Sequence, residues 1–132
     1  MSKISFLSNI VTKPFDRYFE AHECSHFEVN NITQVLSGKV DADYLVLLID
    51  ISYFAFDGFL NDKSNEIFDE LFGLLEFFRK NNSTKVIVSN IAGTYLDINT
   101  SLNIEEHQKL LNLNCKINRF AEISDVAILN IY

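Results

Sequence analysis

The feature that most constrains the fold of this chain is the run Tyr44–Ile49, six consecutive apolar residues between Asp43 and Asp50. A half-buried strand or an amphipathic helix would place polar residues inside such a run at its own period. An uninterrupted short run is instead typical of a strand covered on both faces, as in a parallel sheet between helices. A buried helix is the alternative, but six residues are short for one. We therefore predict that this run is the central strand of an α/β domain.

Shorter strands and helices are predicted to alternate around this run. Apolar segments indicate further strands at Ile4–Leu7, Ser25–Val29, Thr84–Ser89 and Val126–Leu129. Helices are expected to begin near Lys13 with Thr12 or Lys13 as cap, to cover 32–36 before Gly38, to span Ser64–Lys80, and to begin at Asn103 with a capping box to Glu106.

The alternation of strands and helices predicts a topology. Because crossovers between parallel strands are right-handed, it indicates a three-layer α/β sandwich with a five-stranded parallel sheet. The order 2-1-3-4-5 places the most apolar strand at the centre of that sheet. We expect residues 1–132 to form a single domain.

The charge of the chain excludes several classes of partner. The formal net charge is −7, and the eleven basic residues form no cluster larger than Arg79-Lys80. Binding of nucleic acid or of anionic membranes needs concentrated basic residues, so neither partner is expected. Cys24 and Cys115 lie in no metal-ligand or redox spacing, which is typical of reduced thiols in a cytoplasmic protein. No metal and no cofactor is predicted.

Small polar or acidic residues follow every predicted strand. In a parallel sheet, ligands bind outside the carboxyl ends of the strands, so these residues are candidates for a binding site. Ser8, Asn9 and Asp50 are expected to converge where the strand order reverses, between strands one and three. The alternative is that such residues only form turns, as Asn, Asp and Ser often do. The candidate binding residues are Asn9, Asn30, Asp50, Ser52 and Asn90.

The histidines offer no base for a nucleophilic site at these strand ends. A nucleophilic serine needs a base beside it, held in place by a third group. By the predicted boundaries, His22 lies late in the first helix, His26 begins the second strand, and His107 lies in the first turns of the last helix. A Ser-His pair is therefore not supported, and we expect structural or solvent-facing histidines. Ser8 is the candidate nucleophile by its position alone.

Residues Ile4–Thr12 resemble the opening "LSN-x-T" strand and turn of the N-terminal domain of FkbH-like proteins. The strand Asp43–Asp50, the strand Lys85–Asn90 and the ending Val126–Tyr132 follow in the same order as that domain's later strands. The domain is similar to the SGNH, or GDSL-like, hydrolase fold.

The resemblance implies that the hydrolytic machinery is missing. SGNH enzymes carry the nucleophile in a Gly-Asp-Ser motif after the first strand and a late Asp-x-x-His motif. Here Leu7-Ser8-Asn9 stands at the first motif, which places Asn9 at the nucleophile position unless the register shifts to Ser8. The Asp-x-x-His motif should follow the fifth strand, and it does not occur before Tyr132.

The resemblance further implies an accessory, non-catalytic domain at the front of a longer protein. Such a domain would bind an acyl or carrier-bound substrate, or would dock a haloacid-dehalogenase-type domain through an apolar surface at Tyr53–Phe59. The process implied is glyceryl transfer to an acyl carrier protein.

Two alternatives remain open at this point. One is an SGNH-type acyl hydrolase or acyltransferase with Ser8 as the nucleophile and the other triad residues beyond Tyr132. The other is a flavodoxin-like regulatory or interaction domain with Asp50 as its acidic strand-end residue.

Overall fold

The computed structural model describes residues 2–10, 12–55, 60–91 and 104–129. In chain order, its elements are β1 (Lys3–Ser8), the 3₁₀ helix η1 (Lys13–Tyr18), β2 (Glu23–Glu28), η2 (Val29–Asn31), α1 (Ile32–Ser37), β3 (Tyr44–Leu48), η3 (Ile51–Tyr53), α2 (Asp62–Asn81), β4 (Lys85–Ser89), α3 (Ile104–Ser124) and β5 (Ala127–Leu129).

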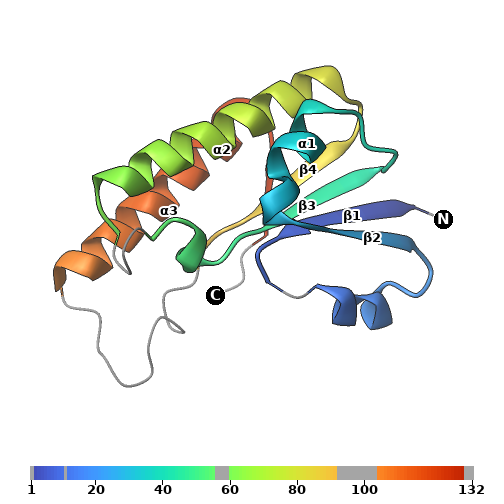
Figure 1. The fold of residues 1–132 in the computed structure, drawn as a ribbon, viewed down its shortest axis with the longest axis horizontal. Coiled ribbons are helices and arrows are strands. Elements are labelled where there is room, and N and C mark those ends of the chain that lie inside the picture. Colours follow the sequence, from blue (N-terminus) through green and yellow to red (C-terminus); the bar gives the residue numbers. More distant parts are fainter. Residues whose placement is uncertain (1, 11, 56–59, 92–103, 130–132) are drawn as a thin grey trace.

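All five strands form one parallel sheet in the order β2-β1-β3-β4-β5, which confirms the predicted order and the central place of β3. Helices α1, α2 and α3 lie on one face of the sheet and η1 lies on the other (Figure 1). The connection from β1 to β2 leads towards the β2 edge of the sheet, whereas the later connections between strands lead towards the β5 edge. With right-handed crossovers it must therefore cross the opposite face.

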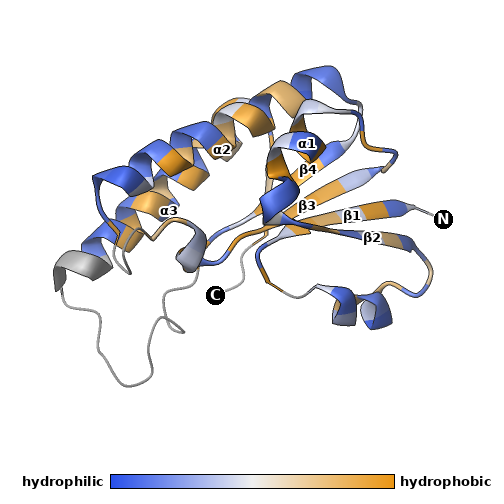
Figure 2. Cartoon of the chain, in the orientation of Figure 1, coloured by the Kyte–Doolittle hydropathy of each residue, from blue (hydrophilic) through white to orange (hydrophobic). Residues whose placement is uncertain are grey.

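The two faces of the sheet carry separate apolar clusters. On the helix face, Leu7, Leu45 and Leu47 belong to a large core that also includes buried residues of α1, α2 and α3. On the other face, Phe6 and Val46 belong to a smaller cluster, against which Phe15 and Phe19 of the η1 segment pack. Figure 2 shows apolar residues along the sheet and on the sides of the helices that face it. The predicted three-layer sandwich is therefore confirmed.

Helix α2 begins two residues earlier than predicted because Asn61 caps it. The Asn61 side chain accepts a hydrogen bond from the backbone N–H of Lys63 at 2.9 Å, and the Ser64 hydroxyl accepts one from the Asn61 N–H at 3.1 Å. The Ser64 hydroxyl in turn donates to the carbonyl oxygen of Phe54. Phe54 is 1% exposed, so it belongs to the core and not to an apolar docking surface. Tyr53 is partly buried and packs against the same core, Ala55 is partly buried, and residues 56–59 of that predicted surface lie outside the described residues.

The first predicted helix is a 3₁₀ helix of six residues with Pro14 in its first turn. Thr12 precedes it but makes no side-chain capping bond, and His22 lies beyond its end. The predicted capping box of α3 falls on residues outside the described side chains. None of the helices in the described ranges has the length and apolar character that a membrane span requires.

Helices α2 and α3 are joined by an electrostatic contact at their carboxyl-terminal ends. Glu76 accepts hydrogen bonds from the Arg79 guanidinium at 2.8 Å and from the Ser124 hydroxyl at 2.8 Å. The bonds from Arg79 and Ser124 lower the pKa of Glu76 from 4.5 to about 2. The Glu76 side chain is 28% exposed, so solvent screens this contact only partly.

Replacement of Glu76 by Gln should lower the free energy of unfolding by about 1 kcal/mol at neutral pH, because the charge-assisted bonds are lost. A carboxyl group with a depressed pKa in the folded state stabilises the fold above its unfolded pKa. The difference between wild type and Glu76→Gln should therefore be complete above pH 4.5 and should shrink as the pH falls towards about 2.

Urea denaturation at several pH values measures this difference. Glu66→Gln is the matched control, because Glu66 is 70% exposed and pairs with Lys63 on the surface. A Glu76→Gln variant as stable as wild type at neutral pH would contradict the assignment.

Candidate functional site

The carboxyl ends of β1 and β3 are joined by a reciprocal pair of hydrogen bonds between Asn9 and Asp50. The Asn9 amide donates to Asp50 Oδ1 at 2.9 Å, and the Asp50 backbone N–H donates to Asn9 Oδ1 at 2.8 Å. Asp50 Oδ1 also accepts from the backbone N–H of Ser52 at 2.8 Å and from the Ser52 hydroxyl. The structure thus brings together three of the five residues proposed for binding.

Ser8 lies beside this pair but is bonded to the main chain. Its hydroxyl donates to the carbonyl oxygen of Leu48 at 2.6 Å and accepts from the N–H of Ile10 at 2.9 Å. The residue is 2% exposed. With its one proton donated to a backbone carbonyl, Ser8 fixes the turn that follows β1.

A pocket of about 440 Å³ opens beside Ser8, between the ends of β1 and β2 and the segment that leads into η1. We call it the rim pocket. Its walls combine apolar and polar side chains: Ser8, Asn9, Ile10, Thr12, Lys13, His26, Phe27, Glu28 and Asn30.

His26 lies in the wall of the rim pocket, which corrects its predicted place. Strand β2 begins at Glu23, so His26 lies inside the strand and not at its start. In the register of the sheet His26 is opposite Phe6, and the two rings stack at 5.3 Å with 6° between their planes. The expectation that no histidine lies at the carboxyl-end rim was wrong for His26.

Both ring nitrogens of His26 have hydrogen-bond partners, Thr12 on one side and Asp16 on the other. Nδ1 lies 2.7 Å from the Thr12 hydroxyl, and Nε2 lies 2.8 Å from Asp16 Oδ1. We call Thr12, His26 and Asp16 the relay. Thr12 is 5% exposed, whereas the Asp16 side chain is 47% exposed. The Thr12 side chain is hydrogen-bonded to His26, which explains why it makes no capping bond to η1.

The relay borders a thiol on the same strand. Burial raises the pKa of Cys24, and the Asp16 carboxylate raises it further through its charge and a hydrogen bond. Cys24 is therefore a protonated thiol at neutral pH, and Asp16 remains the acceptor for its neighbours.

The other predicted binding residues lie apart from one another. Asn30 is exposed and lines the rim pocket, and Ser52 is exposed beside Asp50. The Asn90 N–H donates to the carbonyl oxygen of Leu129 at 3.1 Å, so Asn90 lies at the ends of β4 and β5. Beside it, the Ser89 hydroxyl is buried and has no hydrogen-bond partner within the described part of the chain.

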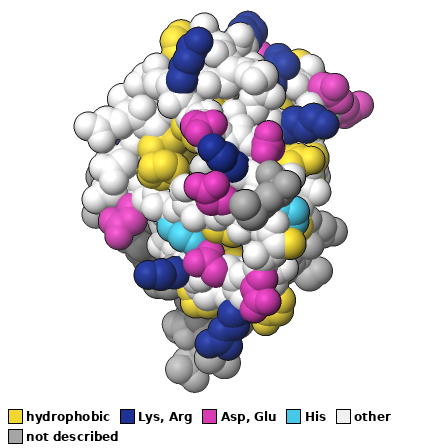
Figure 3. Space-filling view, turned by 90° about the vertical axis from the view of Figure 1, so that its right-hand side faces the viewer, with side chains coloured by type: hydrophobic (Ala, Val, Ile, Leu, Met, Phe, Trp, Pro, Cys, Tyr) yellow, Lys and Arg dark blue, Asp and Glu magenta, His cyan; other side chains and the backbone are white. Residues whose placement is uncertain are grey.

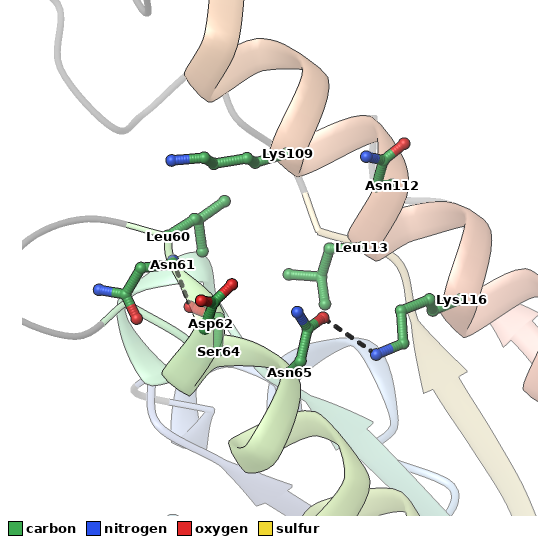
Figure 4. A pocket seen from close by; sticks show the side chains of 9 residues that line it. All are labelled: Leu60, Asn61, Asp62, Ser64, Asn65, Lys109, Asn112, Leu113 and Lys116. Atoms are coloured by element: carbon green, nitrogen blue, oxygen red, sulfur yellow. Dashed lines mark hydrogen bonds between the residues drawn. The ribbon is translucent and has the colours of Figure 1, made fainter.

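A second pocket, of about 410 Å³, lies between the first turn of α2 and the side of α3 (Figure 4). Lys116 points across it and donates to the Asn65 side chain at 3.1 Å, while its ammonium lies 4.4 Å from the centre of the Phe68 ring. Asn61 and Ser64 in its wall form the capping box of α2. The bond between Lys116 and Asn65 joins the two helices, and Asn61 and Ser64 are used in capping α2, so the rim pocket with its relay is the better candidate.

The surface seen from the right-hand side of Figure 1 carries acidic and basic side chains interspersed (Figure 3). Histidine side chains appear between them, and charges of one sign do not form a continuous stripe there.

No family model matches this sequence, and no curated protein matches it. Among solved structures, the chain is similar to one described as the N-terminal part of the protein BF1531 from Bacteroides fragilis, containing a phosphatase domain and complexed with Mg. The TM-score is 0.67 with 14% sequence identity, and the match covers 98% of this chain and 40% of that chain. At this identity the likeness shows the fold alone.

This comparison corrects the proposed kinship with the SGNH-like domain of FkbH-like proteins. The matched structure is described as containing a phosphatase domain and not as an SGNH hydrolase. Its description gives no support to an acyl carrier protein as partner. The interpretation as a non-catalytic accessory domain in glyceryl transfer was therefore wrong. The acyl-hydrolase and flavodoxin-like alternatives gain no support either. A single domain at the front of a longer, cytoplasmic protein stays a prediction.

Replacement of Asn9 by Ala should lower the free energy of unfolding by about 1–3 kcal/mol, because the partly buried N–H and carboxylate of Asp50 both lose their hydrogen bond to Asn9. Thermal and urea denaturation measure the loss. Asn30→Ala is the control, since Asn30 is exposed, and it should leave stability unchanged. Equal stability of the two variants would show that the pair between Asn9 and Asp50 does not hold the two strand ends.

Proposed function

We propose that this domain binds a small polar organic molecule in the rim pocket. The observation that carries the proposal is the hydrogen-bonded relay of Thr12, His26 and Asp16 in the pocket wall. Ligands bind at the carboxyl ends of parallel strands, in pockets that carry a few placed polar groups, and the Thr12 hydroxyl and the His26 imidazole are such groups.

The size and lining of the pocket support a small ligand. A volume of about 440 Å³ falls within the range of roughly 300–1,000 Å³ that is usual for small-molecule sites. Ile10 and Phe27 offer apolar contact, whereas Thr12, Lys13 and Asn30 offer hydrogen bonds. A ligand with a short carbon skeleton and one or two polar groups matches this lining.

The BF1531 structure is described as containing a phosphatase domain and as complexed with Mg, but the described residues of this chain do not form a magnesium site. Mg²⁺ is held by carboxylate and phosphate oxygens, usually with one or two carboxylates from the protein. Asp50 offers one carboxylate, and its Oδ1 already accepts bonds from Asn9 and Ser52. The described part of the chain contains no group of three or more acidic, histidine or cysteine side chains that could hold a metal. We therefore derive no metal-dependent step for this domain.

Titration of the ¹⁵N-labelled protein with glycerol, acetate and ethanolamine tests the proposal by NMR. These probes are neutral, anionic and cationic, and all are small enough for the pocket. At least one should shift the backbone amide signals of Ile10, Lys13 and Asn30 in a saturable way. The variant Asn30→Trp should weaken that binding, because it places a large side chain in the pocket wall.

The variant Asn65→Trp is the matched control, since Asn65 is exposed and lines the pocket between α2 and α3. It should leave the shifts at the rim pocket unchanged. The proposal fails if no probe shifts these signals, or if Asn65→Trp and Asn30→Trp weaken binding equally.

A further inference from the structure

The hydrogen-bond roles in the relay follow from the chemistry of its three groups. At neutral pH a carboxylate such as Asp16 can only accept, so His26 must donate to it from Nε2. In the neutral imidazole the other nitrogen, Nδ1, is then an acceptor. Thr12 must therefore donate its single hydroxyl proton to Nδ1 at 2.7 Å. In this state Thr12 offers only its oxygen lone pairs to the pocket.

Protonation of His26 reverses the role of Thr12. Both nitrogens of a protonated imidazole are donors, so Nδ1 donates to the Thr12 oxygen and Nε2 still donates to Asp16. The Thr12 hydroxyl must then rotate so that its proton points away from His26. Because Thr12 lines the rim pocket, that proton becomes available to a molecule inside it.

We infer that the rim pocket binds small carboxylate anions when His26 is protonated and releases them when it is neutral. This inference rests on the proposed function and names the class of ligand and its regulation. The anion would accept the Thr12 hydroxyl proton and would lie close to the positive imidazole. Lys13 in the pocket wall adds a second positive charge.

The charged groups around His26 are consistent with this switch. Asp16, on η1, lies in direct contact with His26 Nε2. Glu28, two residues along the same strand, and Lys13 are the charged side chains that line the pocket with His26. Cys24, on the other side, remains a neutral thiol, and β1 contributes the uncharged ring of Phe6. Glu28 in the pocket wall repels anions, so only a singly charged anion such as a carboxylate is expected there.

Acetate titrations of the full chain at about pH 5.5 and about pH 8, followed by NMR at matched ionic strength, test the inference. Acetate should bind about tenfold more tightly at the lower pH, as expected for a gained charge-assisted hydrogen bond. Thr12→Val keeps the shape but removes the hydroxyl, so it should lose most of that gain. Thr12→Ser should retain it, and His26→Gln should bind acetate equally at both pH values.

Glycerol is titrated in parallel, because it carries no charge and tests the pocket without the switch. If glycerol or another probe shifts the pocket signals but acetate affinity is the same at both pH values, the inference is overturned and the proposed function stands. The inference also fails if Thr12→Val behaves as wild type. If no probe shifts the pocket signals at either pH, the proposed function and the inference both fail. The amide spectra of the variants show in each case whether the fold is retained.

Discussion

The structure depends on the placement of strand β1 between β2 and β3. All six residues of β1 pair with β2, and five of them pair with β3. After Lys3, every residue of β1 is buried. A strand held on both sides and covered on both faces cannot shift its register without moving its apolar side chains to the wrong face. The carboxyl end of β1 is therefore a fixed point from which side chains reach both neighbouring strands.

The residues around that fixed point connect the core to the rim pocket. On one side, Ser8 and Asn9 bond to the end of β3. On the other, Phe6 stacks on His26, and its ring also lies 5.8 Å from Phe15 and 6.0 Å from Phe19. The same phenylalanine thus packs against the η1 segment and against the imidazole. The hydrogen bond between Asp16 and His26 then links η1 to β2. Packing and hydrogen bonding therefore both fix the position of η1.

Much of this arrangement could be predicted from the sequence, because it depends on local pattern and topology. The apolar run at Tyr44–Ile49 predicted a central strand, and right-handed crossovers then left few possible strand orders. The meeting of Asn9 and Asp50 follows from that order alone. The family resemblance failed for the opposite reason, since it rested on a few short motifs in a fold that many unrelated proteins share.

The relay could not be predicted, because its members are separated in the sequence and meet only through the path of η1. Thr12 and Asp16 lie 14 and 10 residues from His26. Their meeting requires a short 3₁₀ helix to cross the sheet face, where the sequence indicated a longer helix. The predicted start of the second strand at Ser25 also misplaced His26 as an end residue. Placing that strand two residues earlier would have put His26 in its middle, on the same face as Phe6.

The ring nitrogens of His26 give the most direct measurement of the central claim, that the end of β1 gathers Thr12, His26 and Asp16 into one hydrogen-bonded unit. Long-range ¹H–¹⁵N NMR correlations at about pH 8, where the imidazole is neutral, identify which nitrogen carries the proton. We predict a single tautomer with the proton on Nε2, facing Asp16, and an unprotonated Nδ1 that accepts from Thr12. A proton on Nδ1, or two tautomers in rapid exchange, would contradict it.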